Sequence, residues 1–385
     1  MSVMFFISVH GHGRGGHFNS LHHIANKLAE DNQVGIVSFG PGFSPVISEN
    51  SNFIAHIDFN GLNILSLKLK IDRIIKKNRP NIIHCFDVGS YNIIRIFYSP
   101  RKNKIALNKC GGPNPIKYPY VKNLVLFSTE DMQWFQQDKR YNDSNIVLIP
   151  NRVSKIKTKP SDIQKTDGYF TFLRIARIGK TYKKSILDSI NLIELLLERN
   201  NSLKVKLFII GVVECTETLS EINNSKLVEN GVVIILTDKQ YTVNSSKMLY
   251  LADAVIGTGR SVMEAASLGL PVLTINSLNN TPVLIDIGTF DDAFKTNFSE
   301  RNIFPNVVNE ENILKIESII SDREFYEQVS FFINNKFIEY FDIESASVKY
   351  SDFYKGLSLS NKKMAFEDFV LFLKTLYGFF KSSKK

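Results

Sequence analysis

The segment from Leu251 to Ile275, LADAVIGTGRSVMEAASLGLPVLTI, decides the fold of this chain. It predicts a short apolar strand, a turn of small residues, a helix that opens near Ser261, and a second strand after a Gly-Leu-Pro sequence. Four backbone amides are expected to converge at the positive end of that helix, those of Gly257, Thr258, Gly259 and Arg260. Such a turn binds anions, most often the phosphates of a nucleotide.

Strand-like and helix-like segments alternate on the N-terminal side of this motif. Seven short segments rich in Ile, Val and Phe predict strands: Met4–Val9, Val34–Phe39, Phe53–Ile57, Asn81–Phe86, Lys104–Asn108, Leu124–Ser128 and Ile146–Pro150. Amphipathic stretches such as Phe18–Glu30 and Leu62–Asn78 lie between them and predict helices. Alternation of this kind is typical of a parallel sheet with helices on both faces.

The alternation restarts after Lys155–Asp167, a polar and non-periodic segment that predicts an interdomain linker. Strands are expected at Tyr169–Ile175, Lys204–Ile210, Val232–Leu236, Ala254–Gly257 and Val272–Ile275. Helices are expected near Ser185–Arg199, Val243–Leu251 and Val262–Leu268. The sequence therefore predicts two doubly wound α/β domains in tandem, with ligands bound at the carboxyl ends of the strands, in the cleft between the domains.

Length and composition agree with two domains. A chain of 385 residues with 44% hydrophobic and 22% charged residues is an ordinary globular protein and not a mostly disordered one. The predicted parts are an N-terminal domain, a linker, a second domain, a helical return segment and an amphipathic basic tail, at residues 1–154, 155–168, 169–340, 341–360 and 361–385.

Cysteine content and hydropathy indicate a cytoplasmic protein. The three cysteines, Cys85, Cys110 and Cys215, are too few and too widely spaced for a disulfide framework, which fits a reducing compartment. The N-terminus lacks the features of a signal peptide. No apolar run approaches the ~18–20 residues needed to span a bilayer, so integral membrane insertion is not expected.

The net charge of +9 is unevenly distributed. Residues 152–184 contain ten Lys or Arg against two Asp, and residues 362–385 contain six Lys against one Glu and one Asp. Basic clusters of this kind indicate a phosphate-bearing partner, either a nucleotide, a nucleic acid or an anionic lipid. A solvated linker and a soluble tail would explain the same charges.

The tail allows two interpretations. Residues 361–381 predict a helix with lysines at both ends and seven bulky apolar residues at helical spacing: Phe366, Phe369, Val370, Leu373, Leu376, Tyr377 and Phe380. Such a helix can lie in a membrane interface. The same apolar face can instead pack on the protein itself or on a partner subunit.

The loop after the first strand, HGHGRGGHFNSLHH, formally contains a dinucleotide fingerprint at Gly11, Gly13 and Gly16. A nicotinamide cofactor also requires an acidic residue after the second strand to hold the ribose, and that position is occupied by Ser38–Pro41. An NAD-dependent oxidoreductase is therefore disfavoured.

Five of the seven histidines lie in or just after this loop. A zinc site would need three or four converging ligands and a supporting carboxylate, which the loop lacks, so no metal site is expected. We expect instead that the glycines let the backbone approach a substrate and that one histidine acts as a base or hydrogen-bond donor. The candidates are His10, His12 and His17. The alternative is that these histidines have no special role.

Two further groups are candidate ligand contacts. Arg177 and Lys183 belong to a run of five cations that contains no carboxylate, and they could hold a diphosphate from two sides. A solvated basic turn is the alternative. Glu264 lies three residues after Ser261, which predicts a capping box. Its functional alternative is a contact with ribose hydroxyls beside the phosphate turn.

Taken together, these residues resemble family 4 glycosyltransferases of the GT-B fold, particularly enzymes of bacterial surface-polysaccharide synthesis. The resemblance covers roughly the first 350 residues. It is carried by the glycine-rich loop after the first strand, and by Asn108–Pro115 (NKCGGPNP), Ile149–Val153 (IPNRV), Arg177–Lys183 and Gly257–Val272.

The resemblance implies a donor nucleotide-sugar on the second domain and an acceptor on the first, without a cofactor or metal. The residues implied at the donor are Arg177, Lys183, Gly257, Thr258, Gly259, Arg260, Ser261 and Glu264. Those implied on the acceptor side are Gly13, Gly15, Gly16, Lys109 and Asn114. One departure is evident, because a glutamate that the family usually carries eight positions before Glu264 is replaced by Ile256.

The expected function is transfer of a sugar, uridine-linked, to a glycan or polyprenyl-linked precursor, by a cytoplasmic protein docked on the inner leaflet through its tail. No nucleic-acid partner is expected. Two alternatives stay open, a nucleotide-sugar epimerase of the same fold and a non-catalytic nucleotide-sugar-binding subunit. The second gains weight from Ile256, which replaces a carboxylate usually found in the active site.

Overall fold

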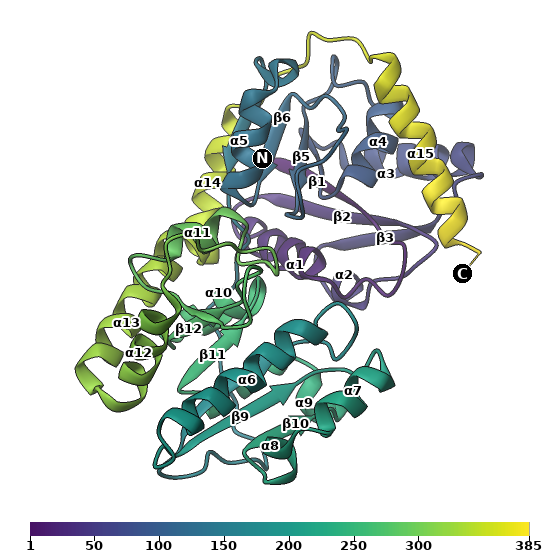
Figure 1. Cartoon of the computed structure of the whole chain (residues 1–385). Coiled ribbons are helices and arrows are strands. Elements are labelled where there is room, and N and C mark those ends of the chain that lie inside the picture. Colours follow the sequence, from purple (N-terminus) through teal and green to yellow (C-terminus); the bar gives the residue numbers. More distant parts are fainter. Residues whose placement is uncertain (385) are drawn as a thin grey trace. The chain divides into compact units, whose positions relative to one another are not determined.

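The computed structural model describes residues 1–384, which form two compact units (Figure 1). The first unit contains residues 1–152 and 343–385, and the second contains residues 153–342. The segment 155–168, expected as a linker, therefore belongs to the second unit, and the tail belongs to the first. Lys385, the last residue of the predicted tail, lies outside the described residues.

The first unit is built on a parallel sheet of seven strands in the order β3-β2-β1-β4-β5-β6-β7. The strands span Ser2–Ser8 (β1), Gln33–Gly40 (β2), Phe53–Asp58 (β3), Ile82–Cys85 (β4), Ile105–Lys109 (β5), Asn123–Leu126 (β6) and Asn145–Leu148 (β7). All seven lie where the apolar segments predicted them. Since both faces of the sheet are covered by helices, these strands are almost continuously apolar.

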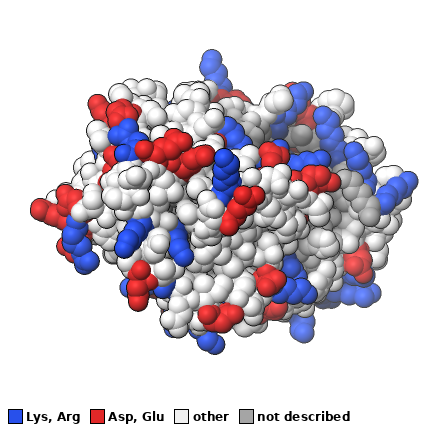
Figure 2. All heavy atoms as spheres, turned by 60° about the horizontal axis from the view of Figure 1, so that its bottom comes forward, with Lys and Arg blue, Asp and Glu red and all other residues white. Residues whose placement is uncertain are grey.

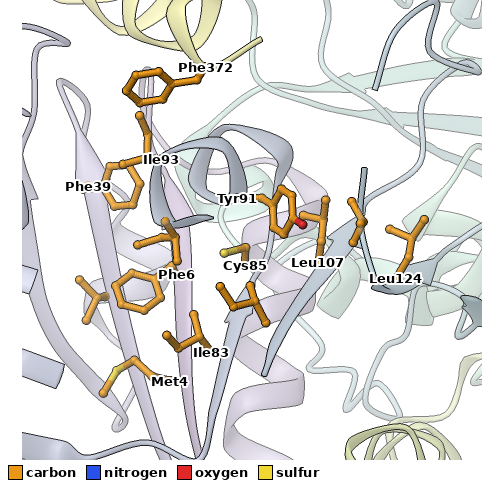
Figure 3. Packing of buried hydrophobic residues seen from close by; sticks show 14 of the residues in the cluster. Met4, Phe6, Phe39, Ile83, Cys85, Tyr91, Ile93, Leu107, Leu124 and Phe372 are labelled. Carbon is orange, nitrogen blue, oxygen red and sulfur yellow. The ribbon is translucent and has the colours of Figure 1, made fainter. Parts of the chain in front are cut away.

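Helices cover both faces of this sheet. They span Gly16–Leu28 (α1), Pro45–Ser48 (α2), Ile64–Asn78 (α3), Val88–Phe97 (α4), Thr129–Gln137 (α5), Ile343–Lys355 (α14) and Phe366–Ser382 (α15), with a 3-10 turn at Lys139–Tyr141. Buried residues of α3, α4 and α15 share one core with the sheet, and those of α1 and α14 share another. Figure 3 shows the first core, in which Phe372 of α15 lies among residues of β1, β2 and α4.

The tail helix α15 packs on its own chain. Phe372 and Phe379 are buried in the core of the first unit. Asp368 is buried as well and pairs with Arg95 and Arg140, at 3.1 and 2.5 Å. Of the two interpretations of the tail, packing on the protein therefore holds for one face of the helix. Part of its apolar surface nevertheless stays exposed, at Phe366, Phe369, Leu373 and Tyr377.

The second unit contains a six-stranded sheet in the order β10-β9-β8-β11-β12-β13. Its strands span Phe170–Ile175 (β8), Val205–Ile210 (β9), Val233–Leu236 (β10), Ala254–Gly257 (β11), Val272–Thr274 (β12) and Val283–Leu284 (β13). Five were predicted. The sixth, β13, was missed because two residues are too short for a periodic pattern, and it runs antiparallel to β12.

Two of the three helices expected in the second unit, near residues 185–199 and 262–268, are present as α-helices, together with others. They span Lys183–Arg199 (α6), Thr216–Asn223 (α7), Lys226–Glu229 (α8), Lys239–Thr242 (α9), Arg260–Ala266 (α10), Phe290–Lys295 (α11), Asn309–Ser321 (α12) and Arg323–Lys336 (α13). The segment expected as a helix at residues 243–251 is a 3-10 helix, Ser245–Leu251 (η2), and a π-helical turn, Phe337–Phe341 (η3), follows α13. Among residues 1–384, no helix combines the length and apolarity that crossing a bilayer requires.

Candidate functional site

Each sheet has one point at which the strand order reverses, and ligands of open α/β sheets bind there, at the carboxyl ends of the strands. In the first unit the reversal lies between β1 and β4, and in the second between β8 and β11. The histidine-rich loop follows β1, and the Gly257–Arg260 turn follows β11. The two sequence motifs singled out for function thus occupy the expected ligand-binding positions of their units.

The turn after β11 differs in detail from the predicted anion cradle. The amide of Thr258 donates to the Ser261 hydroxyl at 3.1 Å, and the amide of Gly259 donates to the Phe298 carbonyl at 2.6 Å. The prediction that four amides converge on a ligand is therefore wrong for these two, because the chain itself uses them. Gly259 has a φ of 55°, a left-handed conformation that favours glycine at the start of α10.

Glu264 does not form the predicted capping box. The helix begins at Arg260, one residue before Ser261, so Glu264 lies too far along the helix to reach its first amides. Its carboxylate instead accepts a hydrogen bond from Arg260 Nε at 2.7 Å. Burial raises the pKa of Glu264, and the charge of Arg260 opposes that shift. This prediction from the sequence pattern was wrong, and the carboxylate is a paired, nearly buried group beside the turn.

The basic segment around Arg177 is also paired within the chain. Arg177 Nη1 donates to Glu214 at 2.8 Å and its guanidinium lies over the ring of Tyr182, while Lys183 pairs with Glu221 at 2.5 Å. The expectation that these cations need an external anion or solvent overlooked acidic residues that come later in the sequence. Arg177 and Lys183 each face a different carboxylate, and both stay accessible to solvent.

Figure 2 shows the charged side chains on one face, in a view that turns the lower part of Figure 1 toward the reader. Basic and acidic side chains are interspersed across it. The charges of Arg177 and Lys183 are therefore balanced by acidic residues of the same unit.

A group that the sequence reasoning missed lies between β8 and β11. Arg174, at the end of β8, is fully buried and pairs with Glu300 at 3.2 Å. The same carboxylate accepts a hydrogen bond from the Thr258 hydroxyl at 3.3 Å. Glu300 stands 25 positions after the end of the Leu251–Ile275 segment and follows no recognisable pattern, so only the fold brings it to the turn. Ile256, the departure noted above, is fully buried within β11.

In the first unit, a carboxylate joins the predicted histidines. Asp87 follows β4 and caps α4, accepting hydrogen bonds from the backbone amides of Ser8 and Ser90, each at 2.7 Å. Its negative charge also acts on His10 and His17. The sequence contained a signal for it, because an Asp between a strand and a helical segment is typical of a helix N-cap.

His10 and His17 are held in different ways. The ring of His10 stacks on Phe379 of α15, and its Nδ1 lies 3.2 Å from the Ser382 hydroxyl. The ring of His17 lies against Phe18. Burial lowers the pKa of both imidazoles, and Asp87 opposes the shift. Both are therefore neutral at pH 7 and able to accept a proton. His12 is exposed.

The glycines of this loop serve the chain in two ways. Gly13 has a φ of 55°, and a Cβ atom there would lie 2.4 Å from the Cβ of Ser44, so glycine is required by packing within the protein. Gly16 has nothing within 4 Å of the position of a Cβ atom, and Gly15 is exposed beside it. Gly15 and Gly16, like the exposed Gly11, leave the open backbone that we expected for a close approach of substrate.

Lys109 has a structural role within the first unit. Its buried ammonium pairs with Asp131 at 2.7 Å and donates to the Gly111 carbonyl at 3.0 Å, which holds the loop after β5 in place. The prediction of a direct acceptor contact is not supported for this residue. Asn114, farther along the same loop, is half-buried, and its Oδ1 atom has no hydrogen-bond partner among the described residues. Among residues 1–384, no three His, Cys, Asp or Glu side chains gather in a way that could hold a metal ion.

Comparisons with known proteins bear on the fold. No protein-family model matches the chain, and no curated protein sequence matches it. Solved structures do match. HepE from Anabaena in complex with UDP has a TM-score of 0.67 and 12% identity over 93% of this chain and 100% of that chain. A glycosyltransferase from Rickettsia africae has a TM-score of 0.65 and 16% identity over 94% and 100% of the two chains.

A third similar structure is sucrose-phosphate synthase from Thermosynechococcus elongatus, with a TM-score of 0.62 and 10% identity over 92% of this chain and 98% of that one. The fold is therefore the GT-B fold, with two Rossmann-like units and a C-terminal helix, as the sequence predicted. At these identities the likeness establishes the fold, and the function has to be argued from the site.

Proposed function

We propose that this protein is a glycosyltransferase that moves a sugar from a uridine diphosphate-sugar to a glycan or polyprenyl-linked precursor. The observation that carries the proposal is the pair of motifs at the two strand-order reversals, in a fold shared with HepE, whose structures contain UDP and UDP-glucose. The donor would bind the second unit and the acceptor the first. The membership of family 4, surface-polysaccharide synthesis and independence from metal are parts of this proposal.

Charge neutralisation is the chemical role proposed for the basic residues. When a nucleotide-sugar bond breaks, negative charge develops on the diphosphate, and nearby cations stabilise it as a leaving group. Arg177 and Lys183 would leave their surface carboxylates, Glu214 and Glu221, to contact the diphosphate. These exposed ion pairs are worth at most about 1 kcal/mol each, so the exchange costs little. Glu264 would accept hydrogen bonds from the ribose hydroxyls.

Acceptor activation is assigned to the loop after β1. A general base must be unprotonated at working pH, and the lowered pKa values of His10 and His17 keep both imidazoles neutral. His12 remains a third candidate within the same loop. Gly15 and Gly16 would let the acceptor approach the backbone.

Calorimetric titration with UDP, GDP and NADH, without added metal, tests the donor assignment. We expect UDP to bind and Arg177→Ala and Glu264→Ala to weaken it at least tenfold. Arg199→Ala is a matched control, because Arg199 is a paired surface arginine of the same unit. Binding of NADH alone would instead indicate an oxidoreductase, and binding of none of the three would remove the donor assignment.

A non-catalytic nucleotide-sugar-binding subunit is the second candidate function. The observation in its favour is Ile256, which is buried in β11 and cannot contact a sugar. Slow hydrolysis of UDP-sugar without acceptor, detected as released UDP, would favour the enzyme. Binding of UDP-sugar without any turnover, with or without polyprenyl phosphate, would favour the subunit. A nucleotide-sugar epimerase would instead convert the UDP-sugar to a second UDP-sugar.

We also propose that the first unit docks on the inner leaflet of a membrane. Phe366, Phe369, Leu373 and Tyr377 form an exposed stripe on α15, at spacings of three and four residues. Helix α3 contains five Lys or Arg and one Asp, and it carries two exposed leucines, Leu65 and Leu69. Leu62, two residues before the helix, is exposed as well. Apolar stripes beside cations are typical of helices that lie in a membrane interface.

Vesicle flotation tests the docking proposal. We expect the protein to float with vesicles that contain anionic phospholipid, and the double variant Phe366→Ser, Tyr377→Ser to float much less. Phe331→Ser is the matched control, because Phe331 is an equally exposed aromatic residue of the second unit. Equal flotation of the double variant and wild type would refute docking through α15. Deletion of residues 361–385 is not a clean test, because it also removes the buried Phe372 and Phe379.

A further inference from the structure

Glu300 is fixed through a single carboxylate oxygen. Its Oε1 atom lies within hydrogen-bond distance of three donors: Arg174 Nη2 at 3.2 Å, the Ser185 hydroxyl at 3.1 Å and the Thr258 hydroxyl at 3.3 Å. In the part of the chain that the structure describes, its Oε2 atom has no hydrogen-bond partner. The side chain is 29% exposed, and a carboxylate oxygen without a partner keeps its capacity to accept hydrogen bonds.

The position of this carboxylate is that of a ligand-binding group. Arg174 belongs to β8, and Thr258 directly follows β11, so the two donors come from the two strands at which the strand order reverses. Ligands of open α/β sheets bind at the carboxyl ends of these strands. Glu300 therefore presents an available oxygen at the site where the donor is proposed to bind.

A counter-ion role alone does not account for the geometry. Arg174 is fully buried, and a guanidinium usually pairs with a carboxylate through two parallel hydrogen bonds. Here Arg174 contacts only Oε1, and its Nη1 atom donates to the Ile256 carbonyl instead. One oxygen thus neutralises the buried cation, and the other remains available for a ligand.

The chemistry of a carboxylate limits what this oxygen can bind. It accepts hydrogen bonds and repels phosphate, so the ligand group must be a hydroxyl or amide donor and not the diphosphate. A nucleotide-sugar carries hydroxyls on its ribose and on its transferred sugar, and Glu264 is the carboxylate proposed for the ribose. We propose that Glu300, through Oε2, binds a hydroxyl group of the transferred sugar and thereby determines which sugar is accepted. This inference rests on the donor site proposed above.

The test compares two ligands that differ only in the sugar. Dissociation constants for UDP and for UDP-glucose are measured by calorimetry with the wild-type protein and with Glu300→Gln. A hydrogen bond to a charged acceptor is stronger than one to a neutral acceptor. We therefore expect the variant to lose about tenfold in affinity for UDP-glucose and to keep its affinity for UDP. UDP-N-acetylglucosamine serves as a second sugar donor in the same comparison, and the inference requires this loss with at least one of the two.

Two further variants keep the result interpretable. Glu317→Gln removes a carboxylate from an ion pair with Arg199 elsewhere in the same unit, and it should change neither affinity. Glu300→Asp keeps the negative charge beside Arg174 but withdraws the oxygens by one methylene, and it replaces Glu300→Gln if that variant does not fold. Thermal melting of each variant checks folding.

The possible outcomes separate the two proposals. Selective loss of UDP-sugar affinity supports the role of Glu300. An unchanged affinity for both UDP-sugars, or an equal loss for UDP and UDP-sugars, overturns it and leaves the nucleotide site in place. If the wild-type protein binds none of these ligands, the proposed function fails and the role of Glu300 fails with it.

Discussion

Substitution of Asp368 by Asn should destabilise the first unit strongly. The carboxylate is almost fully buried and pairs with Arg95 and Arg140, and it also accepts hydrogen bonds from the amides of Tyr120 and Ala365 at 3.1 and 3.3 Å. Asparagine would remove the negative charge and turn an amide group toward donors. Breaking a buried pair in this way costs about 3–5 kcal/mol, because the buried Arg95 loses its counter-charge.

Thermal unfolding measures this cost. For a unit of this size, each kcal/mol corresponds to a shift of about 2–4 °C, so the melting transition of the first unit should fall by about 6–20 °C. Glu367→Gln is the matched control, because Glu367 is exposed and pairs with the same Arg140, at 3.3 Å. Its transition should stay within about 2 °C of wild type. A transition of Asp368→Asn within 2 °C of wild type would refute the reasoning that this ion pair fixes α15 to the unit.

Four other substitutions test the pH dependence and the loops. His84 is fully buried, which lowers its pKa to about 3, so below pH 6.5 the unfolded state binds more protons than the folded state. As the pH falls from 6 to 4, the free energy of unfolding of the wild type, measured by urea unfolding, should therefore fall by up to about 1.4 kcal/mol per pH unit more than that of His84→Asn. Burial lowers the pKa of His10 and His17, so the acid limb of the pH profile of kcat/KM for transfer should have its midpoint below pH 6.5. Substitution of the true base by Ala should remove that limb, and an unchanged profile in both Ala variants would exclude both residues as the base. Lys109→Met leaves Asp131 buried without its cation and should cost about 3–5 kcal/mol in the same unfolding assay, and a cost below 1 kcal/mol would contradict the structural role assigned to Lys109.

The fold could be predicted from the sequence because its signals are local. Strands buried on both faces of a sheet are short apolar runs, and the helices between them have an amphipathic period, so both can be read from neighbouring residues. The strand that was not predicted, β13, has two residues and runs antiparallel to its neighbour. The helix predicted at residues 243–251 is a 3-10 helix in the structure. Its type was not predicted, because apolar spacing alone does not distinguish a 3-10 helix from an α-helix.

The site was predicted less well, because its residues interact across long sequence distances. The loops after β1 and β11 were recognised from their glycines. The partners of their side chains were not, since Glu214, Glu221 and Glu300 come from later segments that only the fold brings near. The run of cations at Arg177 therefore looked uncompensated in the sequence, although carboxylates balance it in the structure.

The apolar pattern of the tail shows why one sequence feature can have two roles. A helix that only packs on its own protein buries one stripe and exposes polar residues on the other side. In α15 the buried stripe contains Phe372 and Phe379, yet Phe366 and Tyr377, at 80% and 66% exposure, lie on the outer side. Aromatic surface that stays exposed contributes nothing to the hydrophobic stabilisation of the fold, so packing on the first unit does not explain this outer stripe. Because the His10 ring stacks on Phe379 and His10 Nδ1 lies beside the Ser382 hydroxyl, a surface that bound α15 would also lie close to the proposed acceptor loop. Together, the two proposals predict an acceptor that is presented at a membrane and not one that is free in solution.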